Sequence, residues 1–177
     1  MTKGVLFLGD SGSGKSRLAL SLLNANGRLV SDDVVEIFRL ENEIVGRAPG
    51  SNSIDGKKRK IREIKGLLEV KGVGIVDIGR VLGPSFVIDK SKIDLAIELV
   101  NEKELSKKTT FDDEDGMGIC SNFCISIEKV QFLGVDIPKI YLDKEIDANR
   151  LIIVLTDFIL GGSKQSTVLK KLLENHD

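Results

Sequence analysis

The glycine-rich octapeptide GDSGSGKS, at residues 9–16, constrains the fold of this chain more than any other feature. The short apolar run GVLFL, at residues 4–8, comes directly before it, and its length and flanking glycines are typical of a buried strand. Residues 15–24 then carry leucines at a spacing that places them on one face of a helix. The sequence therefore predicts a strand, a glycine-rich loop and a helix in that order.

The octapeptide matches the G-x4-G-K-S pattern of a phosphate-binding loop, and it lies in the strand-to-helix context that the pattern requires. Its glycines let backbone N–H groups converge on a polyphosphate at a helix N-terminus, where the helix dipole favours anions. Lys15 would neutralise the β and γ phosphates, and the Ser16 hydroxyl would ligate Mg²⁺. A glycine-rich turn with a surface lysine is the competing interpretation. The expected nucleotide-binding residues are Gly9, Asp10, Ser11, Gly12, Ser13, Gly14, Lys15 and Ser16.

Composition narrows the class of protein further. The 177 residues include 26 basic and 27 acidic side chains, so no overall charge favours nucleic acid or an anionic membrane as a partner. We find no signal peptide and no apolar run of the roughly 18 residues that a membrane span needs, and we expect a cytoplasmic protein. Cys120 and Cys124 are expected to be reduced core thiols. The expected fold is a single strand-rich α/β domain over residues 1–177, with the Walker A loop between the first strand and the first helix.

Two adjacent carboxylates, Asp32 and Asp33, form the second candidate feature. They lie in RLVSDDVVEIFRL, which predicts a strand, and we expect them at the edge of a parallel sheet that also carries the phosphate loop. Adjacent side chains on a strand point to opposite faces, so at most one carboxylate would face the γ-phosphate. That carboxylate could accept a proton from an attacking hydroxyl or hold Mg²⁺ through water. The alternative is a turn at the strand end with an Asx cap.

The third feature is a glycine-punctuated segment, GLLEVKGVGIVDIGRVLG, that predicts strands with tight turns. Glu69 and Lys71 are two residues apart and would share one face of a strand, where they could meet metal and phosphate or pair with each other. Asp77 resembles a Walker B aspartate, although the same position could simply end a strand.

The remaining segments predict further elements. A turn near residues 41–42 suggests a hairpin, residues 89–105 fit an alternating strand over most of their length, and VQFLGVDIPKIYL reads as extended with an interruption at Pro138. RLIIVLTDFILGG fits a strand or a buried helix. STVLKKLLENHD fits a short amphipathic helix, and His176 near its end is expected to be an exposed tail residue.

Residues 50–65 carry six basic side chains and are expected to form a mobile basic loop. This loop could dock phosphate or an acidic partner, or it could be a solvated insertion, which is the more common role of a charge run.

Four segments taken together resemble the catalytic domain of the HPr kinase/phosphorylase family, bacterial enzymes that phosphorylate a seryl residue of the phosphocarrier protein HPr. The segments are GVLFLGDSGSGKSRLAL, GRLVSDDVVEIFRL, LLEVKGVGIVDIGRVLG and FLGVDIPKI. The resemblance implies that Asp32 is the general base toward the substrate serine. It also implies catalytic roles for Lys15 and Lys71, and a magnesium site made by Ser16 and Glu69. Asp33, the neighbour of Asp32, is the third expected magnesium ligand, since a carboxylate at this position could hold Mg²⁺ through water.

The implied activity is that of an ATP-dependent serine kinase, with Mg²⁺ as cofactor, ATP as substrate and an HPr-type phosphocarrier of the phosphotransferase system as partner. The resemblance also suggests a homo-oligomer, with a hexamer as its form. Since the printed chain begins at the first strand, we expect a short form without the family's separate N-terminal domain and without the histidine-bearing strand that normally comes before this point.

Three further departures concern activity. Lys71 stands where the family usually has arginine, which keeps the charge but loses the bidentate fork. A later family arginine would fall near Gly116, in DGMGI, where this sequence has no arginine. After FLGVDIPKI, the sequence YLDKEIDANR stands in place of a family loop that is rich in proline and arginine and associated with dephosphorylation. These departures weigh against phosphorylase activity and leave the kinase residues in place. Two other functions stay open: a regulatory ATP-binding module without turnover, and a kinase or NTPase for a small molecule.

Overall fold

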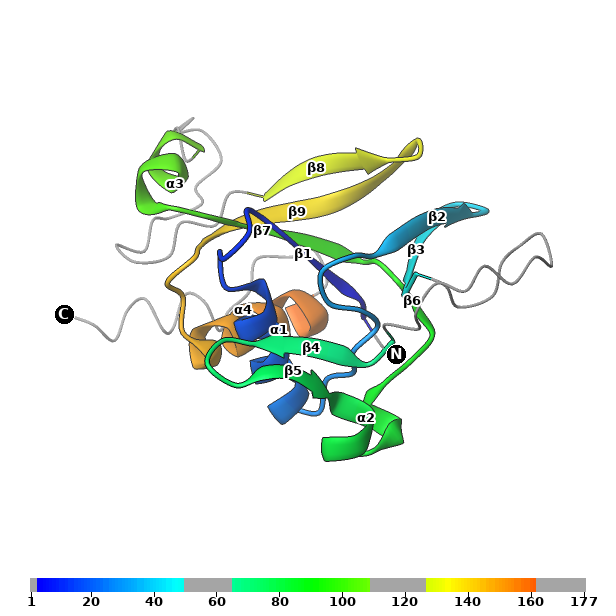
Figure 1. The fold of residues 1–177 in the computed structure, drawn as a ribbon. Coiled ribbons are helices and arrows are strands. Elements are labelled where there is room, and N and C mark those ends of the chain that lie inside the picture. The colour runs from blue at the N-terminus through cyan, green and yellow to red at the C-terminus, as the bar shows by residue number, and fades with distance from the viewer. Residues whose placement is uncertain (1–2, 50–64, 109–126, 162–177) are drawn as a thin grey trace.

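The computed structural model describes residues 3–49, 65–108 and 127–161, and its central layer is a four-stranded sheet (Figure 1). The strand order is β1 (Val5–Leu8), β7 (Leu95–Val100), β9 (Val135–Asp143) and β8 (Ile127–Phe132). β1, β7 and β9 run parallel, and β8 pairs antiparallel with β9. Mixed α/β structure with a parallel sheet agrees with the fold class expected from the sequence.

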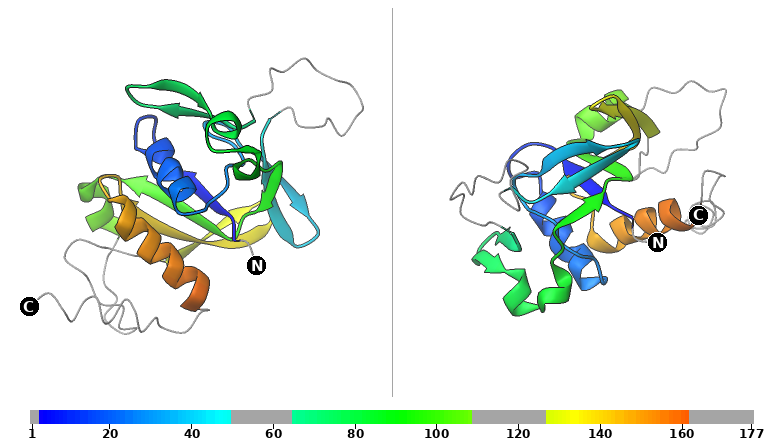
Figure 2. Two further views of the ribbon diagram at one scale, coloured as in Figure 1. Left: turned by 90° about the horizontal axis from the view of Figure 1, so that it is seen from below. Right: turned by 90° about the vertical axis from the view of Figure 1, so that its right-hand side faces the viewer.

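Two helices, α1 (Lys15–Asn24) and α4 (Ala148–Gly161), cover one face of this sheet (Figure 2). Leu18 of α1 and Leu151 of α4 are fully buried there against Leu95 and Ile97 of β7. The leucine spacing had predicted α1 with the bounds observed. RLIIVLTDFILGG, for which the sequence allowed a strand or a helix, forms α4. Its apolar residues Leu151, Val154 and Leu155 are buried against the sheet.

A second, antiparallel sheet covers the opposite face of β1, β7 and β9. It consists of β2 (Glu36–Leu40), β3 (Glu43–Arg47) and β6 (Lys90–Lys92). Ile44 and Ile93 pack there against Leu6, Ala96 and Ile137 of the central sheet. β7 is therefore buried on both faces, which explains why nearly all of its residues are apolar. The strand expected over most of residues 89–105 is present as β6 and β7. Two details differ: the residues of β7 are nearly all apolar rather than alternating, and the helix α3 (Glu102–Lys108) begins at the end of the segment.

A small two-stranded unit packs beside α1. It consists of the hairpin β4 (Leu67–Val70) and β5 (Gly74–Asp77), followed by α2 (Ile78–Val81) and the 3₁₀ turn η1 (Pro84–Phe86). Leu68 and Ile78 are buried against Leu23 of α1 and Leu29. The glycine-rich segment thus gives the expected strands and tight turn, which form a hairpin, but its second part is helical. Asp77 ends β5 and caps α2 by accepting a hydrogen bond from the Arg80 N–H, so the strand-end interpretation of this residue holds.

The structure corrects two other expectations. The strand after α1 begins only at Glu36, and before it Leu29 makes a single parallel bridge with Val87, so Asp32 and Asp33 lie in a loop rather than on a strand. Pro138 does not interrupt β9, because the pairing with β7 begins at Lys139. The hairpin expected near residues 41–42 is confirmed as β2–β3.

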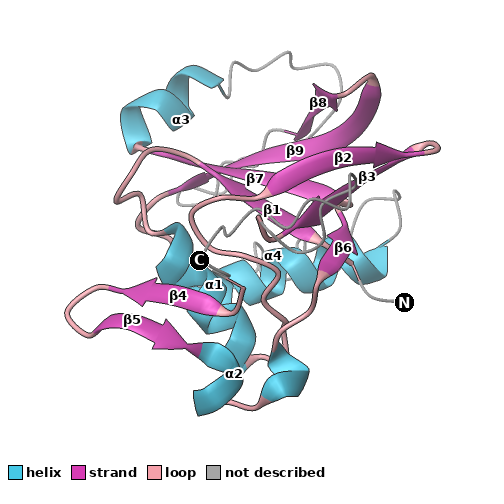
Figure 3. Cartoon of the chain, turned by 45° about the vertical axis from the view of Figure 1, so that its right-hand side comes forward, coloured by secondary structure: helices cyan, strands magenta, loops and turns pink. Residues whose placement is uncertain are grey.

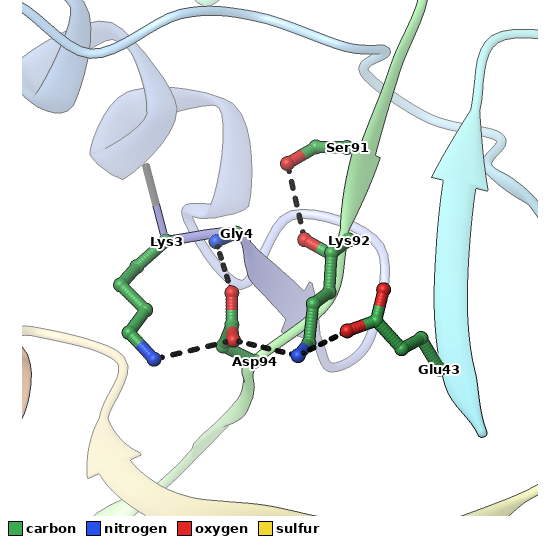
Figure 4. A network of polar contacts seen from close by, with 6 residues as sticks. All are labelled: Lys3, Gly4, Glu43, Ser91, Lys92 and Asp94. Carbon is green, nitrogen blue, oxygen red and sulfur yellow. Dashed lines mark hydrogen bonds and ion pairs between the residues drawn. The ribbon is translucent and has the colours of Figure 1, made fainter. Parts of the chain in front are cut away.

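A polar network lies around the starts of β1 and β7 and links them to β3 and β6 (Figure 4). The Asp94 carboxylate accepts a hydrogen bond from the Gly4 N–H at 3.0 Å and pairs with Lys3 and Lys92. Lys92 also donates to Glu43 at 2.7 Å, and this bond raises the pKa of Lys92. The network holds the two sheets together at that end.

The basic segment 50–64, Gly116, both cysteines, the C-terminal amphipathic segment and His176 lie outside the described residues. Within the ranges that the structure does describe, no helix combines the length and apolar character needed to cross a bilayer.

Candidate active site

The glycine-rich loop, residues 9–14, connects β1 to α1 and has a backbone that favours glycine. Gly9 has φ 133°, and a Cβ on it would lie only 2.8 Å from the carbonyl oxygen of Leu99. Gly14 has φ 96° and forms the left-handed N-cap of α1. Because other residues adopt these dihedrals only with strain, the glycines of the octapeptide are needed for the local fold.

The N-terminus of α1 is open to an anion. No side chain caps it, and no acidic residue lies in its first turn. The first N–H groups of a helix have no partners within the helix and carry its positive dipole end. The Lys15 ammonium lies over the same loop, where it donates to the carbonyl oxygens of Gly9 at 2.9 Å and Asp10 at 2.7 Å. An ammonium group has three N–H donors, so one remains for a ligand.

Ser13 supplies a test of whether this loop fits a polyphosphate. Its side chain is only 8% exposed, and its hydroxyl oxygen has no hydrogen-bond partner in the described part of the chain. A buried polar group without a partner costs free energy, and an orphaned hydroxyl of this kind points to a missing ligand. Together with the open helix end and Lys15, it fits a bound phosphate group.

Asp32 lies directly against the start of α1, although it is not on a strand. Its Oδ1 accepts a hydrogen bond from the Ser16 hydroxyl at 2.8 Å, and its Oδ2 accepts one from the backbone N–H of Glu69 at 2.9 Å. Because the Ser16 hydroxyl donates its proton to Asp32, both lone pairs on its oxygen remain free for a metal ion. The structure thus brings together Ser16, Asp32 and Glu69, three residues predicted from three separate segments of the sequence.

A cavity of about 140 Å³ lies beside Asp32. One wall is the hairpin β4–β5, and the other is the loop that carries both aspartates. The cavity is lined by Ser31, Asp32, Asp33, Leu67, Glu69 and Ile75.

The predicted metal ligands are close to this cavity without forming a closed cage. Asp33 and Glu69 line the cavity. Ser16 is not part of the lining, but its hydroxyl is hydrogen-bonded to Asp32, which is. In the described ranges, no three His, Cys, Asp or Glu side chains are grouped so that they could hold a metal ion. Mg²⁺ is commonly held by one or two carboxylates together with water and substrate phosphates, so this sparse donor set fits Mg²⁺ bound with a nucleotide.

Lys71 is placed differently from the other predicted residues. It lies exposed in the turn after β4, outside the cavity lining. Sequence reasoning also missed Arg17, whose guanidinium donates to the carbonyl oxygens of Lys144 and Ile146, each at 2.9 Å. Arg17 thereby ties the first turn of α1 to the end of β9, and nothing in the local sequence reveals a contact over that separation.

Comparisons with known proteins all point to one family. Residues 1–160 match the family described as HPr Serine kinase C-terminal domain. An HPr kinase/phosphorylase of Clostridium acetobutylicum is 40% identical over 101 residues, which cover 57% of this chain and 29% of that protein. The HPr kinase/phosphorylase of Caldanaerobacter subterraneus is 34% identical over 152 residues, covering 85% of this chain and 42% of the relative. The chain therefore spans less than half the length of these relatives.

The fold has a counterpart of known structure. The Hpr(Ser) kinase/phosphatase from Coxiella burnetii superposes with a TM-score of 0.63 at 24% sequence identity, covering 90% of this chain and 81% of that chain. This structural match shows a shared fold, whereas the sequence match over residues 1–160 shows membership of the family. On that match, the chain belongs to the HPr serine kinase C-terminal domain family.

Proposed function

We propose that this chain is an ATP-dependent protein-serine kinase that phosphorylates an HPr-type phosphocarrier protein. The observation that carries the proposal is the 2.8 Å hydrogen bond between Ser16 and Asp32. It places a carboxylate next to the loop whose geometry suits a polyphosphate. A proton acceptor beside a phosphate site is the arrangement that transfer to a hydroxyl requires.

Residues 9–16 would act as the phosphate-binding loop for ATP. The free N–H groups at the start of α1, the remaining donor of Lys15 and the Ser13 hydroxyl would bind phosphate oxygens. Ser16, Glu69 and Asp33 would hold Mg²⁺, directly or through water. When bound, Mg²⁺ neutralises charge on the phosphates and orients them.

Asp32 would act as the general base. As the serine oxygen forms its bond to the γ-phosphorus, the bond from that phosphorus to the ADP oxygen breaks, and the serine proton passes to Asp32. The two donors that hold Asp32 fix its orientation and leave a further lone pair on its oxygens for the incoming proton. Lys15 would balance the charge that develops on the transferred group.

The cavity beside Asp32 has room for the side chain of a protein acceptor. Its volume is about 140 Å³, and it adjoins the carboxylate proposed as the base.

The proposal is tested by incubating the protein with Mg²⁺, ATP and the HPr of its own source organism, followed by intact-mass measurement. One added phosphate on HPr, absent with Lys15→Ala, is the expected result. Turnover of ATP that does not depend on HPr would instead support a small-molecule kinase or an NTPase. Tight ATP binding without turnover would support a regulatory module.

A further inference from the structure

The hairpin β4–β5 has two chemically different faces. Leu68, Val70 and Val76 point into the core beside α1. Because side chains alternate along a strand, Leu67 and Glu69 lie on the opposite face, and Ile75 joins them as the cross-strand partner of Glu69. An exposed position on this outer face would normally carry a polar residue. Position 75 instead carries an isoleucine, whose exposed fraction is 75%.

This outer face adjoins the candidate base. The backbone N–H of Glu69 points away from β5 and donates to Asp32, so Asp32 lies along the β4 edge of the hairpin. Ile75 lies one strand farther out and lines the same cavity as Asp32. Val73, in the turn at the tip of the hairpin, is 74% exposed. Figure 3 shows this tip projecting away from the rest of the fold.

We propose that Ile75 and Val73 form a docking surface, here called the hairpin patch, for the substrate protein. The patch contacts apolar side chains that flank the acceptor serine, and it thereby selects a serine on a protein surface with apolar neighbours. This inference rests on the proposed kinase function and adds to it the residues that recognise the acceptor.

The position of Ile75 identifies the occupant. Whatever protein covers the hairpin patch also covers the mouth of the cavity that holds Asp32 and Glu69. A second copy of this chain bound there would close that cavity to an acceptor, whereas the substrate protein must bind beside it to deliver its hydroxyl. Continuity between the patch and the cavity therefore favours the substrate protein.

The test compares Ile75→Gln with Val81→Gln in steady-state phosphorylation of HPr. Glutamine is neutral, so it does not change the charge near Asp32, and it removes the apolar contact. Val81 of α2 is 67% exposed and does not line the cavity, which makes it a matched surface control. For Ile75→Gln we expect about a tenfold rise in the KM for HPr, with the KM for ATP unchanged. Ile75→Leu should restore the wild-type KM.

Several results would overturn the inference. An unchanged KM for HPr in Ile75→Gln would show that the hairpin patch does not contact the acceptor, and an equal rise in Val81→Gln would show that the effect is not local. A change in oligomeric state by light scattering, with the KM for HPr unchanged, would assign the patch to a second copy. If the wild-type chain transfers no phosphate to HPr, the proposed function itself fails, and the inference falls with it.

Discussion

Replacing Asp32 with Asn separates the proposed role of this residue as a base from its role in holding the structure. The side chain keeps its shape but has one acceptor oxygen instead of two. The Glu69 N–H can only donate, so the amide oxygen of Asn would stay toward Glu69. The amide NH₂ would then face Ser16. In the wild type the Ser16 hydroxyl donates to Asp32, whereas in the variant it must rotate and accept a hydrogen bond from the amide.

The expected loss of activity is large compared with the loss of stability. A positioned general base typically contributes about 10²- to 10⁴-fold to the rate, which corresponds to about 3–5 kcal/mol of activation free energy. Both hydrogen bonds of Asp32 survive in altered form and are partly open to solvent, so the free energy of unfolding should fall by about 1 kcal/mol or less. Mg²⁺ binding should also weaken, because the rotated Ser16 hydroxyl uses a lone pair to accept the amide proton.

The assay measures kcat for HPr phosphorylation and the thermal midpoint of the Asp32→Asn variant. Asp33→Asn is the matched control, since it removes the same charge from the same cavity without touching Ser16 or Glu69 through a hydrogen bond. We expect Asp33→Asn to raise the Mg²⁺ requirement and to keep most of kcat at saturating Mg²⁺. A kcat for Asp32→Asn within threefold of the wild type would refute the assignment of Asp32 as the base.

Three other variants test the loop and the sheet. Ser13→Ala removes the orphaned hydroxyl, so stability without ligand should be unchanged or raised by about 1 kcal/mol, while ATP affinity by calorimetry falls. Gly9→Ala should lower stability by about 1–3 kcal/mol, because its Cβ would meet the Leu99 carbonyl at 2.8 Å, whereas Gly12→Ala meets no atom within 4 Å and should cost less by urea unfolding. Partial burial lowers the pKa of Lys139, but hydrogen bonding to Tyr141 and pairing with Glu98 outweigh it and raise this pKa above its ordinary value of 10.5. Lys139→Met should therefore be less stable than the wild type at neutral pH, with a difference that shrinks as the pH rises above 10.5; a constant difference would contradict the pairing.

Local spacing explains what could be predicted from the sequence. The first strand, the glycine-rich loop and α1 were all predicted, because each depends on neighbours within a few residues of it. The hairpin turn after residue 70 was predicted for the same reason, since Gly72 and Gly74 have positive φ angles that glycine tolerates. Apolar periodicity left α4 open between strand and helix because a buried element is apolar on most of its surface.

The errors concern residues whose position depends on distant parts of the chain. Asp32 and Asp33 were expected on a strand because RLVSDDVVEIFRL is apolar on both sides of them. Beyond the single bridge at Leu29, however, strand pairing begins only at Glu36, where β3 lies alongside. Pro138 was expected to break a strand, and it does not, because the pairing with β7 starts one residue later. In each case, the neighbouring strand decides the outcome, and that strand comes from elsewhere in the sequence.

Asp32 shows why the candidate site depends on tertiary structure. One carboxylate oxygen is held by Ser16 at the start of α1, and the other by the Glu69 backbone on β4, 37 residues away. The hairpin itself is held in place by Leu68, which is fully buried against α1 and its neighbours. A change that shifts the hairpin therefore turns the carboxylate relative to the loop, even where no residue of the loop is altered. The residues for binding phosphate can thus be read from one short motif, whereas the orientation of the proposed base requires the packing of β4 against α1.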